Sequence, residues 1–396
     1  MPDDSFIEVE CHQASKHAQP VSGDVFFSRK GKDDHRIVSV LSDGLGSGIK
    51  ASVLATLTSS MAAKFVTSDI GITKAARIMM DILPICSERK IGYSTFTIVD
   101  IDAAGHTLII EHDNPSYLVL RGAEHLETPK TTVDLGVDAA SGHERLLLFS
   151  RFRAQAGDRI LFFSDGVNQS GMGRRQMPLG WGLEAVRDFA LGLVRAEPQI
   201  SARDLARRIV EQAVANDEHR PKDDITCGVI YFRRPRRLLV VSGPPFTKES
   251  DVLLAAAVAE FDGKIAICGG TTADIIGREL HRSVHVNLDD DDPFIPPTAI
   301  MAGIDLVTEG TITLARVAEL LDQGIEPEHE RPNAATRLVE LLLNSDLIHF
   351  LIGTRINEAH QDPNVPVELD IRRNIVRKIR ALLEDKCLKE TQLRFF

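Results

Sequence analysis

The sequence predicts an α+β protein in which a layered sheet-and-helix domain precedes a smaller α/β domain. Three observations predict this. Short strand-like runs dominate residues 1–233, and many are joined by turns shorter than the dozen or so residues that a parallel crossover needs. Two helical segments lie between these runs as a block. After residue 233 the pattern changes to strand, helix, strand, helix, which is typical of a small α/β layer.

The elements of the first domain follow from hydrophobic periodicity. Runs rich in β-branched and aromatic residues predict strands at residues 36–41, 94–101, 107–110, 117–120, 159–163 and 225–231. Apolar positions at helical spacing predict helices at 49–65, at 75–82 just before Pro84, and at 202–215. Short turns such as Asp102–Gly105 indicate that neighbouring strands pair antiparallel.

A domain boundary is expected at the basic, proline-bearing segment 233–237, which gives domains 1–233 and 234–396. In the second domain we expect strands at 238–241 and 264–268, a helix at 250–261, and another helix after residue 272. Beyond Pro332 the pattern is mostly helical. It ends in an amphipathic helix with Ile371, Ile375, Ile379 and Leu382 on one face.

Composition excludes several classes of protein. Apolar residues make up 43% and charged residues 26% of the chain, as in soluble globular proteins. The net charge of −11 argues against nonspecific binding to nucleic acid or to an anionic membrane. The five cysteines are scattered, with no C-x-x-C spacing, which indicates a reducing compartment. With no secretory signal and no membrane-spanning run, we expect a cytoplasmic protein.

Four aspartates share a context that indicates metal chemistry. Asp43 and Asp165 each follow a strand-like run and precede glycine, Asp24 follows Ser22-Gly23, and Asp223 stands just before a strand. Strand ends can bring such carboxylates to one rim of a sheet. Anionic oxygens gathered there need hard cations such as Mg²⁺ or Mn²⁺. Two such ions can activate a bridging water, so the pattern favours metal-assisted phosphoester hydrolysis.

Two alternatives compete with this interpretation. Asp-Gly is a common turn dipeptide, so any one of these aspartates taken alone is more often structural. The glycine-rich segment 44–48 also resembles a dinucleotide-binding turn. However, its spacing is not G-x-G-x-x-G, and Asp43 beside it would repel a pyrophosphate. No Gly-Lys-Ser/Thr follows, which disfavours a P-loop.

Five motifs then carry a resemblance to a known family. They are SGD (22–24), SDGLGSGIKA (42–51), EHDNPSYLVL (111–120), ILFFSDGVNQ (160–169) and DDITCGVIYF (223–232). In this order they resemble the SpoIIE-type branch of the PPM (protein phosphatase 2C) metal-dependent serine/threonine phosphatases. The resemblance covers essentially all of residues 1–233. It implies an α-β-β-α sandwich with two antiparallel sheets and a binuclear Mn²⁺ or Mg²⁺ centre.

The resemblance also implies roles for individual residues. Asp43 would bridge the two ions, with the Asp24 carboxylate and the Gly44 carbonyl on one ion and with Asp165 and Asp223 on the other. Asp224 would be a neighbour of the centre. Members of this branch act on phosphoserine or phosphothreonine of small regulatory proteins, typically anti-sigma-factor antagonists. In them, two helices corresponding to about 47–66 and 73–86 resemble a switch that controls metal occupancy.

The remaining motifs have simpler interpretations. Cys227 reads as buried packing, because no cysteine is followed by a phosphate-cradling loop. His219 and Lys222 could help electrostatically, although a solvated loop is favoured. Residues 269–272 could receive an anion at a helix start, although an N-cap by threonine is favoured. The acidic run 289–292 reads as a solvated loop.

Three questions stay open at this stage. The last helix is expected to cover its own domain, but it could dock a partner or form a homodimer. The first domain could be a metal-binding pseudophosphatase that captures a phosphoprotein without turnover. The second domain could instead be a nucleotide-binding sensor, which would make it the working part of the chain.

Overall fold

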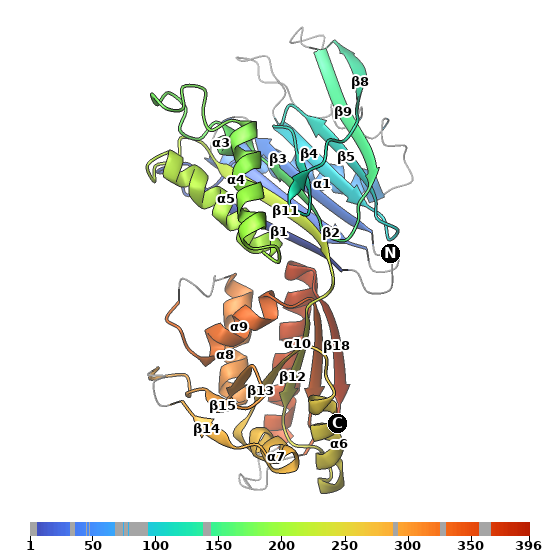
Figure 1. The fold of residues 1–396 in the computed structure, drawn as a ribbon, viewed down its shortest axis with the longest axis vertical. Coiled ribbons are helices and arrows are strands. Elements are labelled where there is room, and N and C mark those ends of the chain that lie inside the picture. Colours follow the sequence, from blue (N-terminus) through green and yellow to red (C-terminus); the bar gives the residue numbers. More distant parts are fainter. Residues whose placement is uncertain are drawn as a thin grey trace. The chain divides into compact units, whose positions relative to one another are not determined.

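The chain folds into two compact units, Met1–Arg234 and Pro235–Phe396, in a computed structural model (Figure 1). The structure describes residues 6–31, 36–44, 46, 48–67, 74, 78, 94–137, 144–287, 292–324, 330–355 and 366–396. Most of the predicted helix at 75–82 therefore lies outside the described residues, as do positions 289–291 of the acidic run. Among the described helices, none combines the length and the apolar character that crossing a membrane requires.

The first unit contains two antiparallel sheets. One has the order β1-β11-β10-β6-β7 and the other the order β2-β3-β4-β5-β9-β8. The strands of the first sheet are β1 (Phe6–Ala14), β6 (Leu118–Arg121), β7 (Glu124–His125), β10 (Asp158–Phe163) and β11 (Ile225–Arg233). Those of the second are β2 (Asp24–Lys30), β3 (Ile37–Gly44), β4 (Ser94–Ile101), β5 (His106–His112), β8 (Lys130–Val137) and β9 (Glu144–Arg153).

The two sheets pack against each other, and helices cover their outer faces (Figure 1). Phe26 on β2 and Phe162 on β10 bring their ring centroids to 5.9 Å. Gly228 on β11 leaves room for them, since a Cβ there would lie 2.8 Å from the Phe26 ring. Helix α1 (Gly48–Thr67) packs on the second sheet, and α4 (Leu183–Ala196) and α5 (Ala202–Asn216) pack on the first. The predicted α-β-β-α sandwich is thus confirmed.

The second unit is a mixed sheet of doubly wound type. Its order is β14-β15-β16-β13-β12-β17-β18, parallel from β16 to β18. The strands are β12 (Arg237–Ser242), β13 (Lys264–Cys268), β14 (Val284–Val286), β15 (Ala299–Met301), β16 (Leu306–Thr308), β17 (Leu347–Ile352) and β18 (Glu390–Phe395). The helices are η1 (Lys248–Ser250), α6 (Asp251–Ala259), α7 (Gly270–Leu280), α8 (Thr311–Gln323), α9 (Ala334–Leu343) and α10 (Pro366–Cys387). Apolar cores lie on both faces of the sheet.

The expectation of a mostly helical segment beyond Pro332 is wrong in part. Strand β17 interrupts it, and the described chain ends in strand β18 rather than in a helix. Periodicity misses β17 because a short apolar run buried on both faces reads equally well as helix or strand. The amphipathic helix itself is present as α10, and Ile375, Ile379 and Leu382 pack into the core of their own unit. Covering that core is therefore its structural role.

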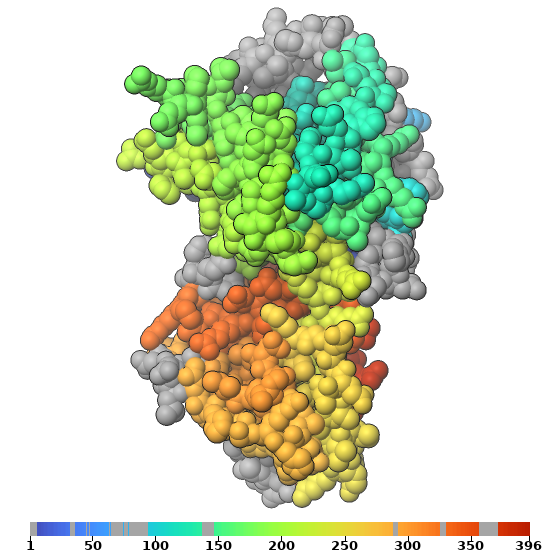
Figure 2. Space-filling view, in the orientation of Figure 1, coloured from blue at the N-terminus to red at the C-terminus, as the bar shows by residue number. Residues whose placement is uncertain are grey.

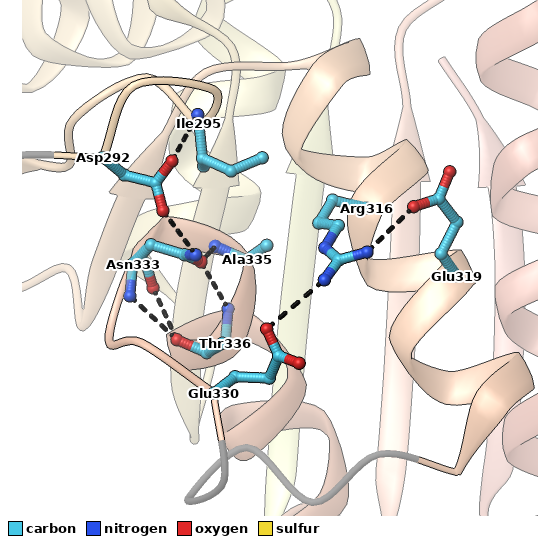
Figure 3. Close-up of polar contacts among 8 residues, drawn as sticks. All are labelled: Asp292, Ile295, Arg316, Glu319, Glu330, Asn333, Ala335 and Thr336. Atoms are coloured by element: carbon cyan, nitrogen blue, oxygen red, sulfur yellow. Dashed lines mark hydrogen bonds and ion pairs between the residues drawn. The ribbon is translucent and has the colours of Figure 1, made fainter.

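Asp292, the described member of the acidic run, has a structural role. Its carboxylate accepts a hydrogen bond from the backbone N–H of Phe294 at 2.9 Å. It also accepts from the backbone N–H of Ile295 at 3.0 Å and from Asn333 Nδ2 at 2.9 Å (Figure 3). Asn333 in turn caps α9 in a capping box with Thr336. These bonds, led by that from Phe294, lower the pKa of Asp292. The carboxylate thus fastens its loop to the start of α9.

Candidate metal centre

Asp24 and Asp43 lie directly opposite each other where β2 and β3 pair. Opposite residues of an antiparallel pair project from the same face of the sheet, so the two carboxylates are neighbours. Burial is the main reason why the pKa of Asp24 is raised to about 7, and Asp224 and Asp165 raise it further. Burial, followed by Asp24 and Asp165, raises the pKa of Asp43 to about 9. Ionising the carboxyl groups of Asp24 and Asp43 therefore costs free energy in the folded chain.

One oxygen of Asp24 is held, and the other has no partner. Thr226 Oγ1 donates to Asp24 Oδ2 at 2.6 Å, and Gln13 Nε2 donates to Thr226 Oγ1 at 2.9 Å. Asp24 Oδ1 is buried and has no hydrogen bond among the described residues. A buried anionic oxygen without a donor is costly. It is therefore an available ligand for a cation.

Asp165 and Asp223 come from the other sheet. Asp165 opens the short helix α3 (Asp165–Asn168) directly after β10, and Asp223 stands just before β11. The two strand ends are joined by hydrogen bonds from Ser164 N to Thr226 O at 3.0 Å and from Thr226 N to Ser164 Oγ at 3.1 Å. Burial, then the charge of Asp223, raises the pKa of Asp165. Asp165 also raises the pKa of both Asp24 and Asp43, so the charges of all four aspartates interact.

Two glycines allow the backbone to approach these aspartates closely. A Cβ on Gly44 would lie 2.2 Å from the carbonyl oxygen of Ala51 at the start of α1. A Cβ on Gly166 would lie 2.1 Å from the carbonyl oxygen of Asp224. Any other residue at these two positions would push apart the segments that carry Asp43 and Asp165. The Asp-Gly dipeptides are therefore packing requirements as well as turns.

Asp224 holds the loop between β1 and β2. Its Oδ1 accepts from Lys16 N at 2.9 Å, and its Oδ2 accepts from Gly23 N at 2.8 Å. Both oxygens of this buried carboxylate therefore have backbone partners. The chain that leads into Asp24 is positioned by this residue.

Three neighbours of the aspartates escaped prediction from sequence. Lys16 Nζ lies 3.8 Å from Asp223 Oδ1, and its charge acts to lower the pKa of Asp165. Gln13 and Thr226 hold Asp24 through the bonds described above. Thr226 belongs to the DDIT motif and could have been found there. Gln13 and Lys16 belong to no motif of the sequence, since strand β1, which contains Gln13 and leads to Lys16, was not predicted.

The sequence also singles out Lys222, His219 and Cys227. Lys222 Nζ donates to the carbonyl oxygen of Met172 at 2.6 Å. His219 is exposed in a left-handed backbone conformation, with φ of 60°. Cys227 is buried in β11, and burial raises the pKa of its thiol well above the ordinary range. The expectation that Cys227 is packing is confirmed.

The four aspartates offer suitable oxygen ligands, but their side chains do not surround an ion. Within the part of the chain that the structure describes, no three Asp, Glu, His or Cys side chains lie close enough together to hold a metal ion. Enclosing an ion requires the carboxylates to move closer than they lie here. The set nevertheless fits a hard divalent cation, because all its donors are oxygens, one is an orphaned buried oxygen, and their mutual repulsion would be relieved.

The threonine N-cap expected at residues 269–272 is wrong. Helix α7 starts at Gly270 with Gly269 as its cap residue, which makes no side-chain capping bond. Thr271 and Thr272 lie inside the helix. Glycine takes the cap position because the backbone there has φ of 135°, a conformation that residues with a Cβ rarely adopt.

Comparisons with known proteins find one matching family and several similar solved structures. Residues 33–233 match the family model of Stage II sporulation protein E (SpoIIE). The phosphatase domain of SpoIIE from Bacillus subtilis is 18% identical, with a TM-score of 0.43 over 58% of this chain and 94% of that one. The RsbU and RsbW domains of Rv1364c from Mycobacterium tuberculosis are 19% identical, with a TM-score of 0.44 over 65% and 68%. RsbX in complex with magnesium is 16% identical, with a TM-score of 0.40 over 57% and 95%. No curated protein sequence matches the chain.

Proposed function

Because the chain belongs to the SpoIIE family, we propose that it is a Mn²⁺- or Mg²⁺-dependent protein serine/threonine phosphatase. The observation that supports the proposal is that Asp24 and Asp43, opposite each other on β2 and β3, interact electrostatically with Asp165 and Asp223 from the other sheet. Asp24 Oδ1, which is buried and makes no hydrogen bond among the described residues, is an oxygen that a bound cation would stabilise.

The proposal assigns a task to each residue. Asp24, Asp43 and the Gly44 carbonyl would hold one ion, and Asp43, Asp165 and Asp223 the other. When bound, such ions activate water and neutralise phosphate charge. Asp43 is the candidate bridge because the charges of both Asp24 and Asp165, from the two sheets, act on its carboxyl. These four aspartates are the candidate catalytic residues, and no covalent enzyme intermediate is expected.

Lys16 adds a cationic side chain beside the aspartates. Its ammonium group lies on the Asp223 side of the cluster and is only partly exposed. A phosphate monoester brings about two negative charges, which an ammonium attracts as a point charge. Lys16 is thus suited to orienting the substrate phosphate, while Asp224 fixes the backbone of the same loop.

The proposed substrate is phosphoserine or phosphothreonine on a regulatory protein, such as an anti-sigma-factor antagonist. Residues 234–396 would then be a regulatory or docking unit. The proposed setting is the cytoplasm, with the chain acting as a monomer or a homodimer.

The test is metal-dependent hydrolysis. The full chain should hydrolyse p-nitrophenyl phosphate and a phosphoserine peptide when Mn²⁺ is supplied, and EDTA should stop both reactions. Asp165→Asn should lose turnover while its circular dichroism spectrum stays unchanged. A full chain that is inactive with both Mn²⁺ and Mg²⁺ would reject the enzyme.

Two other functions have an observation in their favour. A pseudophosphatase is favoured by the spacing of the described carboxylates, which do not close around an ion. It would bind phosphoprotein without turnover. A nucleotide sensor is favoured by the doubly wound sheet of the second unit, a fold type that binds nucleotides. It predicts a nucleotide-dependent thermal shift that EDTA leaves intact.

A further inference from the structure

The segment from Gln169 to Gly182, which joins α3 to α4, forms a compact surface loop. It folds back on itself through backbone hydrogen bonds from Gly173 N to Pro178 O at 3.3 Å and from Met177 N to Arg174 O at 3.0 Å. Its ends are closed by a bond from Gly182 N to Asn168 O at 2.8 Å. We call this segment the 169–182 loop. Compact loops of this length with close ends are frequently functional.

A buried carboxylate anchors the loop to the body of the unit. Asp217, only 5% exposed, accepts from Gly171 N at 2.8 Å and from Lys222 N at 3.1 Å. Lys222 Nζ adds a bond to the carbonyl oxygen of Met172. The loop is therefore fixed before any partner binds, which lowers the entropy cost of binding.

The anchors place the loop beside the aspartate cluster. Gln169, its first residue, donates from Nε2 to Asp165 Oδ2 at 3.0 Å. Gly180, near its end, packs so tightly on Gln169 that a Cβ there would lie 2.7 Å from the Gln169 Cα. The turn that Asp217 ties to the loop leads directly into Asp223. The loop thus adjoins two of the four aspartates.

Several side chains of this fixed loop face solvent. Leu179 is 85% exposed, the largest value among the exposed large apolar side chains that the structure describes, and Met172 is also exposed. Arg174 pairs with Glu218 at 3.0 Å, whereas Arg175 is exposed and has no ion pair within the described residues. No acidic residue occurs in the loop. In Figure 2 it belongs to the green segment that projects at the upper left.

We infer that the 169–182 loop docks the protein substrate, with Arg175 binding an acidic residue close to the phosphorylated side chain and Leu179 packing on an apolar one. The inference rests on the proposed function, because it places the phosphate at the aspartates. The four aspartates by themselves would favour basic sequences around the phosphate. The loop supplies the opposite preference through the positive charge of Arg175.

The experiment separates docking from chemistry. Fluorescent peptides carry a non-hydrolysable phosphoserine analogue, in which a methylene replaces the ester oxygen, flanked by either acidic or basic residues and one leucine. Their dissociation constants for the full chain with Mn²⁺ are measured by anisotropy. The variants are Arg175→Glu, Leu179→Ser and the matched control Arg151→Glu, an exposed arginine on β9. Hydrolysis of p-nitrophenyl phosphate is measured on the same proteins.

The wild-type chain should bind the acidic peptide about tenfold more tightly than the basic one, and Arg175→Glu should abolish or reverse this preference. Leu179→Ser should weaken both peptides by roughly threefold to tenfold. Arg151→Glu should change neither, and the turnover of p-nitrophenyl phosphate should be the same in all four proteins. Equal binding of the two peptides by the wild type, or equal effects of Arg151→Glu and Arg175→Glu, would overturn the inference. A wild-type chain that does not hydrolyse p-nitrophenyl phosphate would instead reject the proposed function. The dissociation constants of the peptides would still decide whether the 169–182 loop docks a phosphoprotein.

Discussion

Asp24 on β2 and Asp43 on β3 face each other as partners in an antiparallel pair, and both have a raised pKa. Like charges placed directly opposite each other destabilise a sheet. Burial adds to this cost, so the pair opposes the folding that brings it together. A structural role gives no reason for such an arrangement, whereas a cation site does.

Replacement of Asp43 should separate stability from activity. Asp43→Asn removes a buried carboxyl that resists ionisation, so we expect the metal-free chain to gain roughly 1–3 kcal/mol at pH 7.5. Turnover of p-nitrophenyl phosphate with Mn²⁺ should fall more than about 100-fold, because the ligand proposed to bridge the two ions would be lost. Thermal melts in EDTA and initial rates measure the two effects. Asp188→Asn, at an exposed position in α4, is the control and should change neither. A destabilised Asp43→Asn would contradict the electrostatic argument.

Metal binding should depend on pH in a definite direction. The pKa of Asp24 rises from 3.8 to about 7 and that of Asp43 from 3.8 to about 9 on folding. At a pH between the unfolded and the folded pKa of each carboxyl, the folded chain keeps a proton that the unfolded chain has lost. The contribution of these groups to the stability of the metal-free chain therefore falls as the pH rises from 4 to 9.

Mn²⁺ must displace those protons, so its affinity should increase from pH 6 to pH 8 by about tenfold or more. Calorimetric titrations in two buffers with different ionisation enthalpies would count the protons released, and about one or two are expected at neutral pH. Melting curves of the chain in EDTA should show a midpoint that decreases over the same range. An affinity that does not change with pH would mean that both carboxyls are already ionised.

Much of the fold and of the candidate site could be predicted from the sequence, because both depend on local sequence signals. Alternating or continuous apolar runs predicted β3, β4, β10 and β11, and the Asp-Gly dipeptides marked the strand ends where the aspartates stand. The failures have physical causes. Strand β1 interleaves apolar residues with Glu8, Glu10, His12 and Gln13, so it carries no continuous apolar run, and the neighbours Gln13 and Lys16 could not be placed. Strand β18 lies at the edge of the sheet, where exposed and half-buried residues alternate over most of its length. Its pairing with β17 is set by tertiary contacts.

Two glycines beside the aspartates should tolerate no side chain. Gly44→Ala would place a Cβ 2.2 Å from the Ala51 carbonyl oxygen, so α1 or β3 must shift. We expect a loss of about 2–4 kcal/mol and the loss of metal-dependent turnover. Gly192→Ala is the matched control, because its Cβ meets nothing within 4 Å in α4. Helix propensity predicts that this control gains about 0.5–1 kcal/mol. Urea melts would measure both, and a Gly44→Ala protein as stable as wild type would show that the close approach is not required.

The carboxylate of Asp217 should control the order of the 169–182 loop. Asp217→Ala leaves the backbone N–H groups of Gly171 and Lys222 without their acceptor, which costs about 1–3 kcal/mol for buried groups. Because the loop contains Arg174 and Arg175, its release should expose a trypsin site. Limited proteolysis followed by mass spectrometry should show cleavage after these arginines several times faster than in the wild type, if cleavage follows the open population. Asp188→Asn again serves as the control. Equal cleavage rates in Asp217→Ala and wild type would show that the internal backbone bonds of the loop are sufficient to order it, and that the anchor is dispensable.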